Sequence, residues 1–468
     1  MQTNRILQGH ILDKLKEIPS DSISCVFTSP PYWGLRAFRT EPQIWGGKTD
    51  CKHHWQEYYQ PPKGGMPLKK LTIGYIKQVQ AGVHAGSGVG GTGVHSQFCS
   101  LCGAWKGELG LEPAPELYIE HLVSCFDEIK RVLRPDGVCF VNIGDSYNSH
   151  SVSAKWAKNT PNKKLAKSVI HSEERNNQCL EASRPRKTTL PNKTLCLIPQ
   201  RFAIAMQQHG WIVRCNIAWV KGMSFAEHKC QHCGRPTRYN GACMPDSTKD
   251  RPNKNGWETI WMFTKNKKYF YEPMFEEAAY DGRKDTTLKP TPKYGSRNIG
   301  QPQSMERQPM ERWPTRDGAT LCRRIRNAWA INSRPNKWNY CKVCDTVFQG
   351  NVCPKCGANK PGKQLTGHYA SFPEELARII IRIGVPEQIC SKCGKPKTSD
   401  DCKNCTCKAP VKPGIILDPF MGSGTVAVQA ERMSRRWLGI ELQKEYVKIA
   451  EHRIKLERNR TKLFEFRG

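Results

Sequence analysis

Two groups of cysteines have a spacing that suits a metal ion. Both follow the pattern C-x2-C-x8-C-x2-C, in "CKVCDTVFQGNVCPKC" and "CSKCGKPKTSDDCKNC". Four thiolates in two close pairs match tetrahedral Zn²⁺, and a site closed by four protein ligands holds the ion for structure rather than catalysis. An iron–sulfur cluster is the alternative, although its usual spacings differ. The predicted zinc ligands are Cys341, Cys344, Cys353, Cys356, Cys390, Cys393, Cys402 and Cys405.

Two further cysteine groups lack an assigned fourth ligand. One flanks a glycine-rich stretch and consists of Cys51, Cys99 and Cys102, with His53 or His54 completing it. The other consists of Cys230, Cys233 and Cys243, with His228 or His232 as its fourth ligand. Metal would hold such short insertions because they cannot bury a core of their own. We expect Cys407 to be spare, and the cysteines in apolar segments to be small core residues: Cys25, Cys125, Cys139 and Cys215.

A glycine loop near the C-terminus, "ILDPFMGSGTVAVQAER", indicates nucleoside binding. An apolar strand leads into Gly422 and Gly424, and a helix opens at Thr425, so backbone N–H groups can approach a ligand. Glu441 ends the next strand, where a carboxylate can accept both ribose hydroxyls of an adenosine group. Asp418 offers an acid to the amine of S-adenosylmethionine. A plain turn is the alternative. Because the loop lacks the complete fingerprints of nicotinamide and triphosphate sites, neither a nicotinamide cofactor nor a nucleoside triphosphate is the expected ligand.

The corner "TSPPYW" follows the apolar stretch "SISCVF". Two consecutive prolines cannot lie inside a helix or a central strand, because neither has an N–H and each fixes its own φ. The corner is therefore either a turn or a rigid holder for a flat group.

Strands and helices alternate in the segments that carry these loops. Periodicity predicts helices over 115–133, 199–210 and 372–384, a buried strand in "VCFVNIGDSY" after the turn "RPDG", and a strand over 211–220. Residues 257–272 predict two strands joined by a Lys/Asn turn, and residues 5–28 a short helix followed by a strand. This alternation predicts an α/β fold with a mostly parallel sheet covered by helices on both faces.

Composition points to a nucleic-acid partner in the cytosol. The 468 residues include 38% hydrophobic residues, enough for a core, and the formal net charge is +31, far more than solubility requires. No apolar run reaches the ~18 residues of a membrane helix, and the N-terminus lacks the apolar stretch of a signal peptide. In a cytoplasmic protein, which we expect to be of prokaryotic or phage origin, the 22 cysteines are not expected to form disulfides, and metal binding becomes the leading alternative.

Six segments, taken in order, resemble the beta class of DNA amino-methyltransferases. They are "ISCVFTSPPYW", residues 111–147, "LIPQRFAIAMQQHGWIVRCNIAWVK", "WETIWMFTKNKKYFYE", "HYASFPEELARIIIRIG" and "DPFMGSGT", and they cover most of the chain outside its insertions. The resemblance implies a permuted Rossmann-like methyltransferase sheet with small Cys-rich zinc-ribbon insertions. It also implies S-adenosylmethionine as methyl donor and double-stranded DNA as substrate.

The resemblance assigns roles to matching residues. A base flipped out of the duplex would occupy a pocket formed by Ser29, Pro30, Pro31 and Tyr32. Ser29 and the carbonyl of Pro30 would accept hydrogen bonds from its amine, while Tyr32 stacks on the ring. The cofactor would be held by Asp418, Phe420, Gly422, Gly424, Thr425, Glu441 and Phe372. Family members usually carry Gly-Asp shortly before the catalytic strand, but this chain has Gly9-His10, so the cofactor contact of that Asp is not assigned here.

The target base follows from the first residue of the pocket. Serine is the commoner form in enzymes that methylate cytosine N4, which makes cytosine the first choice and adenine N6 the alternative. A zinc-containing DNA-binding protein with an inactive methyltransferase core is the competing function, and methylation of RNA or of a protein is a third. The recognition sequence, a companion restriction endonuclease and the oligomeric state stay open.

The insertions divide the expected domains. Residues 1–50 begin the catalytic half, 51–110 are a glycine-rich insertion, and 111–275 continue the catalytic half with a basic loop at 150–193 and a Cys-rich insertion at 228–245. Residues 276–362 form a basic target-recognition region with the first four-cysteine ribbon. Residues 363–468 form the cofactor-binding half, interrupted by the second ribbon at 390–407.

Overall fold

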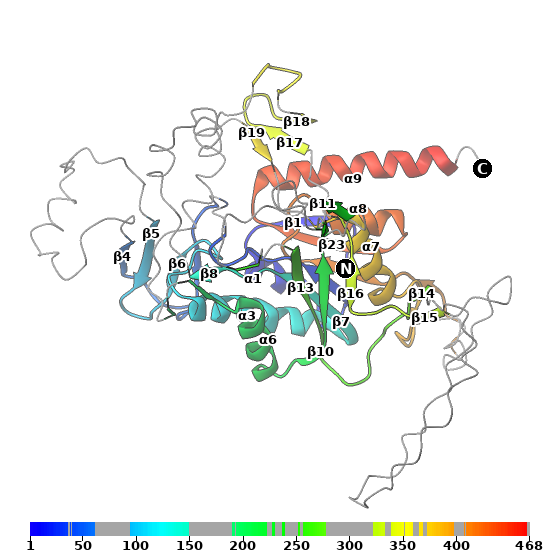
Figure 1. The fold of residues 1–468 in the computed structure, drawn as a ribbon, viewed down its shortest axis with the longest axis horizontal. Coiled ribbons are helices and arrows are strands. Elements are labelled where there is room, and N and C mark those ends of the chain that lie inside the picture. The colour runs from blue at the N-terminus through cyan, green and yellow to red at the C-terminus, as the bar shows by residue number, and fades with distance from the viewer. Residues whose placement is uncertain are drawn as a thin grey trace, which may run out of the picture. The chain divides into compact units, whose positions relative to one another are not determined.

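The computed structural model describes residues 1–35, 38, 40–60, 94–148, 190–191, 193–221, 227–229, 236–238, 251–252, 256–277, 322–332, 338–350, 352–358, 365–367, 372–396, 407 and 409–465 (Figure 1). Most of the glycine-rich insertion and of the basic loop lies outside these residues, as do Cys230, Cys233, Cys243, Cys402 and Cys405. The chain forms two compact units, one of Met1–Tyr271 with Ala328–Gly468 and one of Glu272–Asn327. In the smaller unit, β14 (Phe275–Glu277) pairs antiparallel with β15 (Cys322–Arg324).

An 8-stranded sheet organises the larger unit, in the order β1-β23-β22-β2-β7-β13-β10-β16. Its strands are β1 (Arg5–Gln8), β23 (Arg436–Glu441), β22 (Ile415–Asp418), β2 (Ile23–Thr28), β7 (Leu133–Ile143), β13 (Trp257–Thr264), β10 (Ile212–Val220) and β16 (Ala328–Ala330). Neighbours from β1 to β7 pair in parallel, whereas β13 runs antiparallel to both β7 and β10. The predicted, mostly parallel sheet is therefore confirmed.

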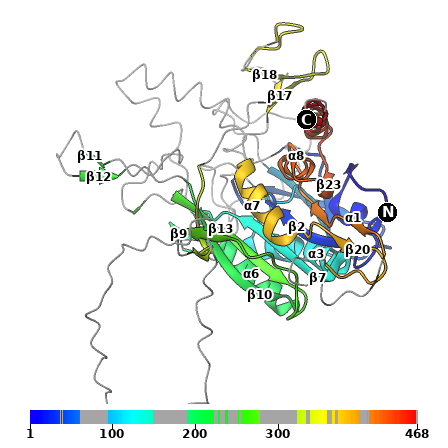
Figure 2. The ribbon, with the colours of Figure 1, turned by 90° about the vertical axis from the view of Figure 1, so that its right-hand side faces the viewer.

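Helices cover both faces of this sheet, as predicted. Figure 2 shows α3 (Pro115–Val132) and α6 (Ile198–Gln208) on one side, with α7 (Glu374–Gly384) and α8 (Thr425–Arg432) on the other. The helix α1 (Ile11–Lys16) packs on α3, and α9 (Lys444–Glu465) packs on α8. The two-sided cover explains why β2 is buried at every position, as a strand of a parallel sheet must be. None of the helices that the structure describes combines the length and apolarity needed to cross a membrane.

Several elements differ from the sequence-based predictions. Residues 257–272 do not form a two-stranded hairpin, because β13 already pairs with β7 on one side and β10 on the other and leaves no position for a returning strand. The helix α3 runs directly into β7 at Leu133, without an intervening "RPDG" turn. Within the 8-stranded sheet, two short strands were not predicted: β1 before α1, and β16, which pairs with β10 at the sheet edge.

Small sheets carry most of the described cysteine pairs. The first has the order β3-β6-β5-β4, with β3 (Gln43–Trp45), β6 (Trp105–Gly107), β5 (Val94–Cys99) and β4 (Trp55–Gln60). The second small sheet has β17 (Trp338–Cys341) between β18 (Thr346–Gln349) and β19 (Leu365–Gly367). We call it the first ribbon, because it carries the first of the two four-cysteine groups. Two-stranded pairs complete the larger unit: β20 (Ile389–Cys390) with β21 (Val411–Lys412), β8 (Tyr147–Asn148) with β9 (Thr194–Leu195), and β11 (Glu227–Lys229) with β12 (Pro236–Arg238).

Candidate active site and metal-binding clusters

The sheet brings the two sequence motifs together. After the roles that the sequence resemblance implies, we call Ser29–Tyr32 the base loop and Asp418–Gly424 the cofactor loop. The strands that lead into them, β2 and β22, pair in parallel, so both loops leave the same edge of the sheet. The buried Thr28 hydroxyl donates to Asp418 Oδ1 at 2.7 Å, although the two residues are 390 positions apart. This hydrogen bond joins the end of one motif to the start of the other.

The cofactor loop is closed by the side chain of Glu441. Its Oε2 accepts the N–H of Gly422 at 2.7 Å and its Oε1 accepts the N–H of Gln443 at 2.8 Å. Gly424, with φ of 80°, precedes α8, and a Cβ there would lie 2.9 Å from the Cβ of Ala450. The loop therefore needs glycine both for its left-handed backbone and for its close approach to α9.

Burial controls the charge of both acids. It raises the pKa of Asp418 to about 7, against hydrogen bonds from Thr28 and the N–H of Phe420. It also raises the pKa of Glu441 to about 7, against the N–H groups of Gln443 and Gly422. Both carboxyls thus titrate near neutrality, where ligand hydroxyl or amine donors favour the ionised form. The strand-end acids and the glycine loop fit an adenosine cofactor that carries an amine.

Other predicted cofactor residues surround this loop. Phe372 is buried at the start of the segment leading into α7, with its ring centroid 4.5 Å from that of Phe27. Phe420 donates its N–H to Asp418 at 3.2 Å, and Thr425 is the first residue of α8. Sequence reasoning missed Arg453 of α9, whose guanidinium donates to the Ser423 carbonyl at 2.6 Å and holds the outer side of the loop.

Hydrogen bonds and a close contact with a glycine fix the base loop. The Tyr118 hydroxyl donates to the carbonyl of Pro31 at 2.8 Å, and Ser29 Oγ donates to the Tyr32 hydroxyl at 3.0 Å. A Cβ on Gly144 would lie 2.6 Å from Cε2 of Tyr32, so this glycine lets the end of β7 contact the aromatic ring. Burial and the nearby Glu258 raise the pKa of Tyr32 well above its usual value, and its phenol therefore stays protonated.

Three polar residues missed by sequence reasoning complete this edge. Glu258 lies at the start of β13 and Asn142 near the end of β7, and Lys221 follows β10. The Tyr32 hydroxyl donates to Glu258 Oε2 at 2.8 Å, while Asn142 Nδ2 donates to both at 2.8 and 2.9 Å. Lys221 forms an ion pair with the other oxygen of Glu258. The one amide in the run "VCFVNI" and the one carboxylate in "WETIWMFT" were the available signals for Asn142 and Glu258.

His10, which stands where the family usually has Asp, packs on an aromatic side chain. Its ring meets Trp45 edge-on with centroids 4.7 Å apart, and burial lowers its pKa. Its Nε2 is buried and has no hydrogen-bond partner among the described residues.

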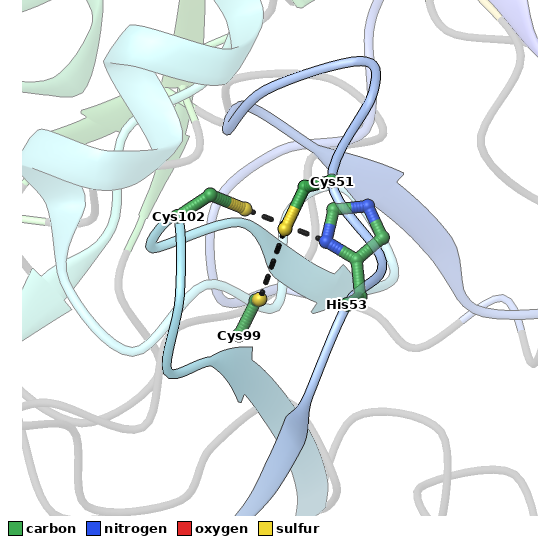
Figure 3. A group of neighbouring side chains, drawn as sticks. All are labelled: Cys51, His53, Cys99 and Cys102. Atoms are coloured by element: carbon green, nitrogen blue, oxygen red, sulfur yellow. Dashed lines mark hydrogen bonds between the residues drawn. The ribbon is translucent and has the colours of Figure 1, made fainter.

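The first candidate metal cluster joins the two ends of the glycine-rich insertion (Figure 3). Its ligand atoms lie within 4.8 Å of one another and belong to Cys51, His53, Cys99 and Cys102, which selects His53 rather than His54. The sulfurs of Cys51 and Cys99 are 3.8 Å apart, and that of Cys102 is 3.4 Å from His53 Nδ1. Ligands about 2.3 Å from a tetrahedral zinc ion lie about 3.8 Å apart, so the donors fit Zn²⁺.

The second cluster belongs to the first ribbon. The sulfurs of Cys341 and Cys356 are 3.6 Å apart, and those of Cys344 and Cys353 are 3.4 Å apart. These distances also suit tetrahedral zinc with four thiolates.

The first ribbon packs on α9. Tyr340 forms an apolar cluster with Tyr446 and Ile449 of that helix, and Lys342 pairs with Glu445 at 2.6 Å. The ribbon therefore lies on the helix that follows Glu441, although it comes from a distant part of the sequence.

The third cluster corrects a sequence-based prediction. Cys407 was expected to be spare, but its sulfur lies within 4.8 Å of those of Cys390 and Cys393. Pairing of β20 with β21 returns the chain to this point, where the N–H of Ser391 donates to the carbonyl of Pro410 at 2.9 Å. The spacing pattern alone could not reveal this return.

One hydrogen-bond pattern recurs in the three clusters. In each C-x2-C-G turn, the glycine N–H donates to the carbonyl of the first cysteine, at 2.9 Å for Gly103 and Gly357 and 3.0 Å for Gly394. These turns point two sulfurs in one direction, as a shared metal ion requires.

Comparisons with known proteins identify the family of the chain. A family described as "DNA methylase" matches residues 23–452. The chain is 27% identical over 456 residues to Type II methyltransferase M.Cfr9I of Citrobacter freundii, covering 97% of this chain and 88% of that protein. It is 25% identical to M.SmaI of Serratia marcescens, covering 97% and 91%. A solved structure titled PvuII DNA methyltransferase (cytosine-N4-specific) matches with 14% identity and a TM-score of 0.42, covering 97% of this chain and 86% of that one. The chain belongs to the DNA methylase family of S-adenosylmethionine-dependent enzymes that methylate cytosine N4 or adenine N6 in DNA.

Proposed function

We propose that this protein methylates cytosine N4 in double-stranded DNA as the modification enzyme of a Type II restriction-modification system. The observation that carries the proposal is the hydrogen bond between Thr28 and Asp418, which couples the base loop to the cofactor loop at 2.7 Å. Ser29, next to Thr28, presents a hydroxyl rather than a carboxylate, which favours cytosine over adenine. The Type II names of the relatives support the biological setting.

The residues of the base loop would orient the amine. Ser29 Oγ and the Pro30 carbonyl accept its two N–H groups, which turns the nitrogen lone pair toward the methyl donor. The Pro-Pro backbone and the Tyr118 hydrogen bond keep these acceptors in place before the base arrives. When bound, S-adenosylmethionine supplies a methyl group on a positively charged sulfur. Gly422, Asp418 and Glu441 are the proposed groups that hold it.

The net charge of +31 supports DNA as the polymer that delivers the base. A cytosine inside a duplex cannot reach the base loop, so the target nucleotide must be flipped out of the stack.

We further propose that the clusters hold structural zinc. Four thiolates, or three thiolates and one imidazole, leave no open position for substrate, and this argues against a catalytic metal. The first ribbon packs on α9, so its zinc would stabilise the helix whose Arg453 holds the cofactor loop. Elemental analysis of the purified protein should find zinc, and the iron and sulfide of an iron–sulfur cluster would contradict this assignment.

The decisive experiment on function uses purified protein, S-adenosylmethionine and duplex DNA, with the modified nucleoside identified by mass spectrometry. N4-methylcytosine is the expected product. N6-methyladenine as the sole product would overturn the choice of base. Ser29→Ala should abolish methylation while cofactor and DNA binding persist. Calorimetry with S-adenosylmethionine tests the competing function, since an inactive core would give no binding signal.

A further inference from the structure

A chain of hydroxyl groups leads from the base loop to a carboxylate. Ser29 Oγ lies 3.0 Å from the Tyr32 hydroxyl, which lies 2.8 Å from Glu258 Oε2. Asn142 Nδ2 donates to both the Tyr32 oxygen and Glu258 Oε2, and Lys221 donates to Glu258 Oε1. Glu258 is thus the meeting point of three donors that come from the base loop, β7 and the end of β10.

The carboxylate determines the direction of this chain. An ionised carboxylate can only accept hydrogen bonds, so the phenol proton of Tyr32 must point to Glu258. The Tyr32 oxygen then accepts from Asn142 and from Ser29, and the Ser29 proton must point to Tyr32. Ser29 Oγ is left with lone pairs for a further donor, which is the condition for accepting an N–H of the target amine.

We propose that Glu258 is a positioning residue for methyl transfer: it makes Ser29 a hydrogen-bond acceptor through Tyr32 and receives the proton that the methylated amine releases. This inference rests on the proposed function. The amine nitrogen forms a bond to the methyl carbon while the carbon–sulfur bond breaks and its electron pair stays on sulfur. The resulting alkylated, positively charged amine then loses one proton to Ser29 Oγ. The Ser29 proton passes to Tyr32 and the Tyr32 proton to Glu258.

The surroundings of Glu258 suit both tasks. Lys221 compensates its charge and fixes one oxygen, so the other oxygen faces Tyr32. The side chains of Glu258 and Lys221 are each 18% exposed, which gives the acquired proton a route to water before the next turnover. Asn142 is 2% exposed. Because an ionised carboxylate only accepts hydrogen bonds, the Asn142 atom that faces Glu258 must be the amide nitrogen, and this fixes the orientation of the Asn142 side chain.

Glu258→Gln tests the direction of the chain. Lys221 is a donor and requires the amide oxygen, so the amide nitrogen must face Tyr32 and act as a donor there. The Tyr32 proton then points toward Ser29, and the Ser29 proton points toward the target amine. The Ser29 hydroxyl and the amine N–H are then both donors, so Ser29 no longer accepts a hydrogen bond from the amine. We expect the single-turnover methylation rate at saturating DNA and cofactor to fall about 10²-fold. Tyr32→Phe, which interrupts the chain, should cause a similar loss.

A second substitution separates positioning from folding. In Glu258→Gln combined with Lys221→Met, the amide can rotate and present its oxygen to Tyr32, which restores the acceptor at Ser29. This double variant should recover about tenfold of the lost rate, with incomplete recovery because an amide cannot take up the proton. Lys221→Met alone should lose less than tenfold. Glu116→Gln, a 60% exposed surface glutamate paired with Arg201, is the matched control and should retain the full rate.

Three outcomes decide the inference. Loss in Glu258→Gln with recovery in the double variant, at unchanged cofactor affinity and melting temperature, supports it. A wild-type rate in Glu258→Gln, or no recovery in the double variant, overturns it while the proposed function stands. A wild-type protein that transfers no methyl group to DNA overturns both.

Discussion

The affinity for S-adenosylmethionine should rise steeply with pH between 6 and 8. Asp418 at the start of the cofactor loop and Glu441, whose side chain closes it, have pKa values raised by burial to about 7 in the free protein. A cofactor that donates hydrogen bonds from ribose hydroxyls and an amine binds the ionised carboxylates. Binding must therefore remove any proton that either acid carries, which weakens affinity below pH 7.

The size of the effect follows from the pKa. A group of pKa 7 that must be ionised weakens binding by a factor of about 11 at pH 6 and about 1.1 at pH 8. Each acid thus contributes about a tenfold change in Kd over this range, and the two together about 10²-fold. Above pH 8 the affinity should level off as far as these acids are concerned.

Isothermal titration calorimetry in buffers of different ionisation enthalpy measures both Kd and the protons released. Glu441→Gln removes one titrating group, so we expect its Kd to change only about tenfold between pH 6 and pH 8. Glu445→Gln is the matched control, because Lys342 holds the pKa of Glu445 below its usual value, against the effect of burial. Its pH dependence should equal that of the wild type.

A pH-independent Kd without proton release would refute the assignment of the two acids. So would an unchanged pH dependence in Glu441→Gln. If Glu441→Gln does not bind the cofactor at all, the titration is repeated with Asp418→Asn. The Kd of that variant should show the same reduced dependence on pH between pH 6 and pH 8.

Four further predictions follow from the geometry. Gly144→Ala puts a Cβ 2.6 Å from the Tyr32 ring, so the single-turnover methylation rate should fall at least tenfold with little change in cofactor Kd. Gly424→Ala, at φ of 80°, should lower the free energy of unfolding by about 1–3 kcal/mol, measured by urea titration. The cofactor-free protein should lose stability as pH rises from about 4.5 to 7, because Glu441 and Asp418 have raised pKa values and must ionise while buried; thermal melts test this. Cys407→Ser should lower the zinc content per chain in elemental mass spectrometry, whereas Cys215→Ser should leave it unchanged.

The local chemistry of the main motifs was readable from the sequence. A double proline after an apolar strand, glycines between a strand and a helix, and paired cysteines all place their constraints within a few residues. The α/β class followed from the alternation of strands and helices for the same reason. The prediction of a second strand in residues 257–272 was wrong. A strand needs an unpaired strand edge beside it, and both edges of β13 are already paired.

The sequence by itself determined the base loop, the cofactor loop and the cysteine pairs, because each is a short motif whose conformational demands act on adjacent residues. Only the tertiary structure decided that Glu258, Asn142 and Lys221 meet at Tyr32, since they arrive on separate strands and become neighbours through sheet pairing. It likewise selected His53 and added Cys407 to its cluster, because ligand geometry depends on how distant segments return to one point in space.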